Sequence, residues 1–288
     1  VRSRSSLDGA TRILNFITAF LLCSSLFFAI YRHPFLLSRK HYSGSGPKAS
    51  GGTARHTDMP DVYYILLDGY SSKHTFKEWC GFDNSPFEDA LKKRGFFIPQ
   101  EPISNYIETL FSLTSSLNME YIHQPHKDIR SQSGALQRKL EANKTLFMLK
   151  KRGYSYVHIG SGYAITNFNR YADRMVFCGN SNEFFAVFLG TTAFRPLLAS
   201  AFSKDKRRRA YCISNEMKKI APGGSPKFVF AHLEIMHPPY VFGPKGEPYV
   251  QKTRGWGAPD EYVYQAETMN RMILSIIDEI LKNSSSTP

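Results

Sequence analysis

The distribution of apolar residues predicts three buried strands in this chain. Val62–Leu67, in the stretch PDVYYILLDGY, is an unbroken run of aliphatic, aromatic and β-branched residues. Such a run is typical of a strand that is buried on both faces of a sheet. Residues 228–233 carry a second run of this kind, and residues 154–159 carry a third.

Helical patterns separate these strands. The stretch SPFEDALKKRGFFI predicts a helix with Pro86 near its start and Gly95 as its stop, followed by a short strand. The stretch NKTLFMLKKRG predicts a helix that Asn143 caps and Gly153 ends. Near the end of the chain, one set of apolar residues recurs at helical spacing, namely Ala266, Met269, Ile273, Ile276, Ile277 and Ile280. This alternation predicts an α/β domain with a mostly parallel sheet and helices on both faces.

The N-terminal part of the chain has a different composition. Residues 13–31 carry no charge, and at about 1.5 Å per residue they are long enough to span roughly 30 Å of bilayer. They predict a transmembrane helix, with a cleaved signal peptide as the alternative. The sequence therefore predicts a membrane anchor over 1–42, a flexible linker rich in Gly and Ser over 43–59, and an α/β domain over 60–288.

The 288-residue chain has a formal net charge of +13, and its most obvious basic cluster is the stretch SKDKRRRA at 203–210. Basic clusters bind nucleic acid in some proteins, but no zinc-finger, KH or RRM signature accompanies this one. We therefore interpret it as a solvated or membrane-facing loop and expect no nucleic-acid partner.

The four cysteines, Cys23, Cys80, Cys178 and Cys212, lie far apart and form no CxxC pair. This spacing argues against a zinc–thiolate site. A disulfide is compatible with an oxidising compartment, but the spacing alone does not establish one.

Three stretches carry candidate chemistry at strand ends or in loops, and the first contains Asp68. This residue directly follows the first predicted strand, and Gly69 lets the chain turn there. In an open parallel sheet, ligands bind beyond the carboxyl ends of the strands. From this stretch alone, Asp68 is equally compatible with a metal ligand or catalytic acid and with a side chain that caps the next turn.

The second stretch contains Thr109 and Ser112, at the start of a predicted helix that runs to Asn118. A hydroxyl at a helix N-terminus meets free backbone N–H groups and the positive end of the helix dipole, which suits the attack of an anionic ester. The alternative is that Thr109 only caps the helix.

The third stretch is HLEIMHPPY, in which Pro238 and Pro239 fix the loop of His237. This imidazole is placed either to contact a phosphate or sulfate group or to lie on the surface without a role.

Taken together, YYILLDGY, NYIETLFSLTSSLN and HLEIMHPPYVFGP, in this order, resemble the sulfatase branch of the alkaline phosphatase superfamily. The likeness is to bacterial membrane-anchored sulfatase-like proteins, relatives of lipoteichoic acid synthases and phosphoethanolamine transferases, over residues 60–283. It implies a metal-dependent hydrolase or transferase that acts outside the cytoplasm on sulfate or phosphate esters, including lipid- or glycan-linked ones. The implied cofactor is a divalent Mn, Mg, Ca or Zn ion.

The resemblance also implies roles for individual residues. By position, Asp68 is a metal ligand, Thr109 is both the nucleophile and a metal ligand, and Ser112 and His237 bind the substrate. Thr114 is a weaker candidate for the nucleophile, because it would leave the serine of the family's motif unmatched.

The sequence departs from the family's pattern in three ways. It has no Cys-x-Pro-x-Arg, so a formylglycine mechanism is not expected, and Gly69 stands where many sulfatases have a second aspartate. The sequence also lacks the family's Asp-His-Gly metal motif. We therefore expect the domain to be incomplete at its C-terminus and the polypeptide as given to be inactive. The alternative function is a catalytically inactive binding or scaffold protein with this fold.

Overall fold

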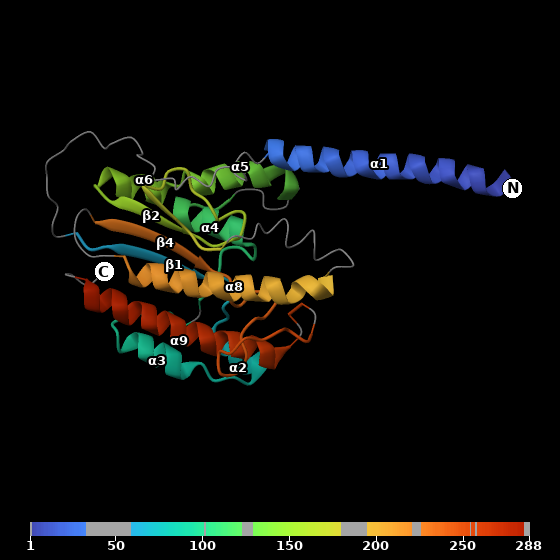
Figure 1. The fold of residues 1–288 in the computed structure, drawn as a ribbon. Coiled ribbons are helices and arrows are strands. Elements are labelled where there is room, and N and C mark those ends of the chain that lie inside the picture. Colours follow the sequence, from blue (N-terminus) through green and yellow to red (C-terminus); the bar gives the residue numbers. More distant parts are fainter. Residues whose placement is uncertain are drawn as a thin grey trace. The chain divides into compact units, whose positions relative to one another are not determined.

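The computed structural model describes residues 2–32, 59–100, 102–122, 129–179, 195–220, 226–253, 255–256 and 258–284. The chain divides into two compact units, Val1–Ser43 and Gly44–Pro288. Figure 1 shows the elements of both units, and each unit is considered by itself below.

The first unit contains the helix α1 (Arg2–Arg32). The prediction of a helix over 13–31 is confirmed, although α1 begins earlier, in the polar segment that includes Asp8 and Arg12. In the part of the chain that the structure describes, no helix is both long and apolar enough to cross a membrane. The predicted membrane crossing is therefore not supported by the structure.

The second unit is built on a sheet of parallel strands. The described strands are β1 (Val62–Leu67), β2 (Ser155–Gly160), β3 (Arg174–Phe177) and β4 (Lys227–Leu233). They pair in the order β1-β4-β2-β3, and every pairing is parallel. The predicted parallel α/β architecture is thus confirmed, and three of these four strands were predicted from the sequence.

The strand β1 is less buried than its apolar sequence predicts. All six of its residues are half-buried, whereas six of the seven residues of β4 are buried. The reason is the strand order, because β1 has a neighbour on one side only among the described strands and β4 lies between β1 and β2. The prediction of a strand was correct, but the prediction that it is fully buried was wrong.

Helices cover both faces of the sheet (Figure 1). Alternate residues of β4 belong to two different cores, one on each face. On one face, Phe228 and Phe230 of β4 pack in a core with α4 (Thr109–Asn118), α5 (Ile129–Glu141) and α6 (Lys144–Lys151). On the other face, Val229 and Ala231 pack in a core with α2 (Lys73–Cys80), α3 (Ser85–Lys92), α8 (Arg195–Lys218) and α9 (Pro259–Asn283). Since side chains alternate along a strand, one apolar run supplies both cores.

Local chemistry explains the helix ends that were predicted. Asn143 caps α6, because its side chain accepts a hydrogen bond from the backbone N–H of Leu146. Gly95 and Gly153 follow α3 and α6 with φ of 88° and 89°, in the left-handed region that favours glycine. All members of the apolar set predicted for the last helix are buried in α9. These predictions are confirmed.

Two other predictions were wrong. No strand follows Gly95, and in the segment after it Phe96 and Phe97 are exposed.

The basic stretch at 203–210 is also not a loop, because it belongs to α8. In that helix Arg207 donates hydrogen bonds to the carbonyl oxygens of Val241 and Tyr249, and Arg209 pairs with Asp205. Part of the cluster therefore stabilises the domain itself.

A disulfide joins Cys178, just after β3, to Cys212 in α8. The pairing was not predicted from the sequence. It connects a strand end to the helix that covers one face of the sheet. Cys23 and Cys80 are free thiols.

Candidate active site at the carboxyl ends of two strands

Asp68 lies at the carboxyl end of β1, as the sequence predicts. Its backbone N–H donates to the carbonyl oxygen of Leu233, the last residue of β4, over 3.0 Å. Gly69 follows with φ of 72°, and its carbonyl oxygen accepts a hydrogen bond of 2.6 Å from the hydroxyl of Tyr262 in α9. The pairing of β1 with β4 and the α9 tyrosine thus fix the backbone on both sides of the Asp68 carboxylate.

Thr109 contacts this carboxylate. Its Oγ1 lies 3.2 Å from Oδ1 and 3.3 Å from Oδ2 of Asp68 and donates to them. Thr109 is the first residue of α4, and the residue in the N-cap position is Glu108. The interpretation of Thr109 as a mere cap is therefore wrong. The structure places two residues that are 41 positions apart in the sequence in direct contact.

A third residue at this site, His232, escaped the sequence analysis. It lies in β4 with a fully buried side chain, and its Nε2 is 3.3 Å from Oδ2 of Asp68. Its other ring nitrogen, Nδ1, is 2.7 Å from Oγ1 of Thr166. One signal could have revealed it, namely a histidine inside an otherwise apolar strand that ends beside the strand of Asp68.

The charges around Asp68 keep it ionised. Burial acts to raise the pKa of this carboxyl, because it penalises the charged form. The hydrogen bond and charge of His232, the charge of His237 and the hydrogen bond of Thr109 act in the opposite direction and prevail. The pKa of Asp68 is therefore below its ordinary value, and the group is a carboxylate at neutral pH.

His237 lies in the loop that follows β4, and the loop is held from several sides. Its backbone N–H donates to the carbonyl oxygen of Glu234 over 3.1 Å. Its ring packs edge-on against Trp256, with 4.7 Å between the ring centroids. The ammonium group of Lys206 in α8 donates to the carbonyl oxygens of His237 and Pro239. The predicted fixed loop is present, and helix α8 contributes to it.

Lys206 is itself a polar group near the site. Its side chain is half-buried, and its ammonium group donates to two carbonyl oxygens of the loop. This burial lowers the pKa of Lys206 to about 7, against the opposing charges of Glu234 and Asp68. Lys206 can therefore hold or release a proton near neutral pH.

The two other predicted residues, Ser112 and Thr114, do not contact Asp68 in the structure. Oγ of Ser112 lies 3.0 Å from Oγ of Ser104 in the loop before α4, so this serine contacts the loop and not Asp68. Thr114 is fully buried, and its hydroxyl points to the carbonyl oxygen of Leu136 at 3.5 Å. Thr109, and not Thr114, is the threonine that faces the carboxylate.

The donor atoms near Asp68 offer a divalent ion two kinds of ligand. Among the described residues, no group of three or more His, Cys, Asp or Glu side chains is arranged to hold a metal ion. Asp68 and Thr109 supply oxygen, and Nε2 of His232 is buried and faces Oδ2 of Asp68 at 3.3 Å. A buried nitrogen that faces a carboxylate fits an ion that accepts both donors, such as Zn²⁺ or Mn²⁺.

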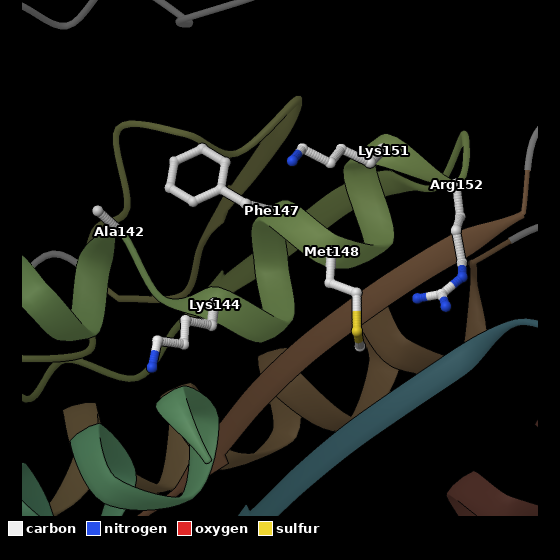
Figure 2. Close-up of a pocket in the computed structure, with 6 residues that line it drawn as sticks. All are labelled: Ala142, Lys144, Phe147, Met148, Lys151 and Arg152. Atoms are coloured by element: carbon white, nitrogen blue, oxygen red, sulfur yellow. The ribbon is translucent and has the colours of Figure 1, made fainter. Parts of the chain in front are cut away.

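A separate cavity of about 470 Å³ lies on the outer side of α6. Figure 2 shows the six side chains that line it, all of them in α6 or at its two ends: Ala142, Lys144, Phe147, Met148, Lys151 and Arg152. None of the candidate site residues lines this cavity. The candidate active site is therefore defined by its polar contacts and not by this cavity.

Comparison of the chain with protein-family models, with curated proteins and with solved structures finds no match.

Proposed function

We propose that this protein is a metal-dependent hydrolase or transferase that acts on sulfate or phosphate esters through Thr109 as the nucleophile. The observation that carries the proposal is the contact of the Thr109 hydroxyl with the Asp68 carboxylate, 3.2 Å away at the carboxyl end of a parallel strand. This is the position at which open parallel sheets bind their ligands. The resemblance of the three ordered motifs to sulfatase-like proteins supports the same function.

The residues of the site have distinct roles in this proposal. Asp68, Thr109 and His232 would hold the divalent ion, which when bound supplies positive charge that favours the ionised threonine hydroxyl. The hydroxyl lies at the N-terminus of α4, where free N–H groups and the helix dipole favour a negative charge. Thr109 Oγ1 attacks the phosphorus or sulfur atom, the ester oxygen leaves, and water or an acceptor hydroxyl then releases the group from Thr109.

In this proposal His237 contacts the substrate, and Lys206 positions His237. The imidazole of His237 binds an oxygen of the phosphate or sulfate group or protonates the leaving oxygen. Lys206 holds the carbonyl oxygens of His237 and Pro239 and thus the position of the imidazole. Ser112 lies three residues after Thr109 in α4, and its hydroxyl holds the adjoining loop through Ser104.

The disulfide supports a location outside the cytoplasm. Disulfides form and persist in oxidising compartments and are rare in cytosolic proteins. The bond between Cys178 and Cys212 therefore agrees with an extracytoplasmic catalytic domain, where lipid- or glycan-linked esters are available as substrates.

The test is turnover of aryl phosphomonoester, phosphodiester and sulfate substrates by the full chain, with and without EDTA. The sequence alone predicts an inactive polypeptide, whereas the contact of Thr109 with Asp68 favours activity. We therefore expect turnover that requires Mn²⁺ or Zn²⁺ and that Thr109→Ala and Asp68→Asn each reduce by about a thousandfold or more. Thr75→Ala is the matched control, because it removes another threonine hydroxyl from the first turn of a helix. Metal-dependent turnover that survives Thr109→Ala would remove Thr109 from the mechanism.

A second candidate function is binding of an anionic ester without turnover. It is favoured by the N–H groups of His237 and Lys206 beside the Asp68 carboxylate, since such groups donate hydrogen bonds to an anion. Calorimetric titration with inorganic phosphate and sulfate distinguishes the two. Stoichiometric binding with no turnover of any ester, with or without added metal, would establish the binding function in place of the enzyme.

A further inference from the structure

An exposed tryptophan forms one wall of the candidate site. Trp256 has 54% of its surface exposed, and its ring lies edge-on against the imidazole of His237 at 4.7 Å. It also lies against the backbone of Gly69, the residue directly after Asp68. Trp256 therefore contacts both the residue assigned to the substrate and the neighbour of the carboxylate that faces Thr109.

The space beside Gly69 explains why a side chain is absent at that position. A Cβ atom at residue 69 would lie 3.2 Å from Cη2 and 3.5 Å from Cζ3 of Trp256, and φ of Gly69 is 72°. A contact of 3.2 Å is tighter than ordinary van der Waals packing, and few side chains adopt this backbone conformation. The indole thus occupies space that a second carboxylate at residue 69 would need, and this wall of the site is aromatic and not acidic.

The indole of Trp256 contacts a histidine and a glycine on one side and is exposed on the other. Its exposed side adds little to the packing of the domain. An aromatic face binds other rings by stacking, including aryl groups and the apolar faces of sugar rings. Tryptophan also brings large contact area at a low entropy cost, because only two side-chain torsions are ordered. An open-chain alkyl group offers no flat face for the same contact.

We propose that Trp256 is a stacking platform for a ring in the organic part of the ester, so that the substrate class is ring-bearing esters and not open-chain ones. This inference rests on the proposed function and extends it by naming the substrate class. The ring is either an aryl group or a sugar, and both share the chemistry that Trp256 recognises.

The chain contains two tryptophans, which makes a direct binding test possible. Trp79 in α2 is 76% exposed. In a full-length Trp79→Phe variant, Trp256 is the single indole, and its fluorescence reports on this wall of the site. The titrants are phenyl phosphate, glucose 6-phosphate, glycerol 3-phosphate and inorganic phosphate, and each affinity is repeated by calorimetry so that light absorption by phenyl phosphate cannot mimic quenching.

We expect phenyl phosphate or glucose 6-phosphate, or both, to change the Trp256 emission and to bind about three- to tenfold more tightly than glycerol 3-phosphate. The ester that does so identifies the source of the ring. Trp256→Ala should abolish this preference, and Trp256→Phe should restore it in large part because a ring is retained. Equal affinity for glycerol 3-phosphate and both ring esters would overturn the proposal.

The same variants separate the two proposals. If no ester is turned over but ring-selective binding is present, the proposed function fails and the role of Trp256 stands. If turnover is metal-dependent and Trp256→Ala lowers kcat/KM equally for ring and open-chain esters, the role of Trp256 fails and the proposed function stands. The Trp256→Phe variant should fold, because it removes only part of an exposed side chain.

Discussion

Nε2 of His232, in β4, lies 3.3 Å from Oδ2 of Asp68, which directly follows the adjacent parallel strand β1. His232 pairs in register with Leu66, so Asp68 projects two residues further along, at the edge of the sheet. The histidine is fully buried, whereas the carboxylate keeps 19% of its side-chain surface exposed. A buried imidazole thus contacts a carboxylate that remains partly accessible to solvent.

The first prediction concerns this pair. His232→Ala should raise the pKa of Asp68, because the hydrogen bond and charge of His232 help to hold that pKa below its ordinary value. In the metal-free protein, the titration of Asp68, followed by carboxyl NMR, should then move to higher pH. Metal-dependent activity should fall by at least about 100-fold, because His232 is also a proposed metal ligand. His74→Ala is the control, because this histidine is exposed in α2. An Asp68 titration that stays in place in His232→Ala would contradict the assignment.

The second prediction concerns the buried His158 in β2. Its Nε2–H donates to the carbonyl oxygen of Thr166 over 2.8 Å, so its Nδ1 accepts from the hydroxyl of Tyr156. Burial lowers the pKa of His158 to about 4, whereas the unfolded chain has a histidine pKa of about 6.5. Between these values the unfolded state binds a proton that the folded state does not, so stability is lost as pH falls from 6.5 to 4.

The expected loss is about 3 kcal/mol, the product of the pKa difference and 1.36 kcal/mol per unit. Urea unfolding at a series of pH values measures it. His158→Gln should retain a donor and an acceptor but flatten the pH dependence in this window. An unchanged slope in the variant would show that other groups cause the acid sensitivity.

The third prediction concerns the disulfide. The two cysteines are 34 positions apart, and a loop of this size corresponds to a stabilisation of about 4 kcal/mol in the chain-entropy account. Cys178→Ser/Cys212→Ser, or reduction of the wild type, should therefore lower the free energy of unfolding by about this amount. Cys80→Ser should have little effect, because Cys80 is a free thiol.

A count of free thiols in denaturant checks the same bond. The unreduced protein should show the two free thiols of Cys23 and Cys80. Four reactive thiols without reductant would mean that the bond between Cys178 and Cys212 is absent.

The fourth prediction compares two neighbours in α6. Leu146 is fully buried among the residues that cover one face of the sheet, and Phe147 is 39% exposed with an edge-on contact to Tyr171. Leu146→Ala should cost about 2–5 kcal/mol because it opens a cavity, and Phe147→Ala about 1 kcal/mol. Thermal and denaturant unfolding measure both, and equal costs would show that the core is not where the structure places it.

Much of the fold could be predicted from local pattern. The runs at Val62–Leu67 and 228–233 are apolar enough to define strands, and Asn143 and Gly153 define the ends of α6 by their own chemistry. The short strand β3 escaped prediction, because Arg174–Phe177 has four residues, two of them exposed and none fully buried. A pattern that depends on burial gives little signal where burial is slight.

The candidate site was predicted only in part, because its contacts are not local. Asp68 and Thr109 each have a local signal, a strand end and a helix start, and the structure brings them together. His232 opens the stretch HLEIMHPPY but marks no turn or cap, and its contact with Asp68 depends on the register between β1 and β4. The cluster at 203–210 was wrongly predicted to be a loop. Lys206 and Arg207 donate to backbone carbonyl oxygens, and a backbone partner cannot be recognised from the sequence.

The strand order also has a consequence for synthesis of the chain. The partner of β1 is β4, and Asp61 beside β1 binds the N–H of Lys227, 166 positions later. At about 5–20 residues per second, translation of that interval takes roughly 10–30 s. Throughout this time the apolar run of β1 is outside the ribosome without its partner, and such a run is suited to wrong strand pairing. The site around Asp68 therefore assembles late, and any pause before β4 is complete prolongs the period in which the nascent chain is open to aggregation.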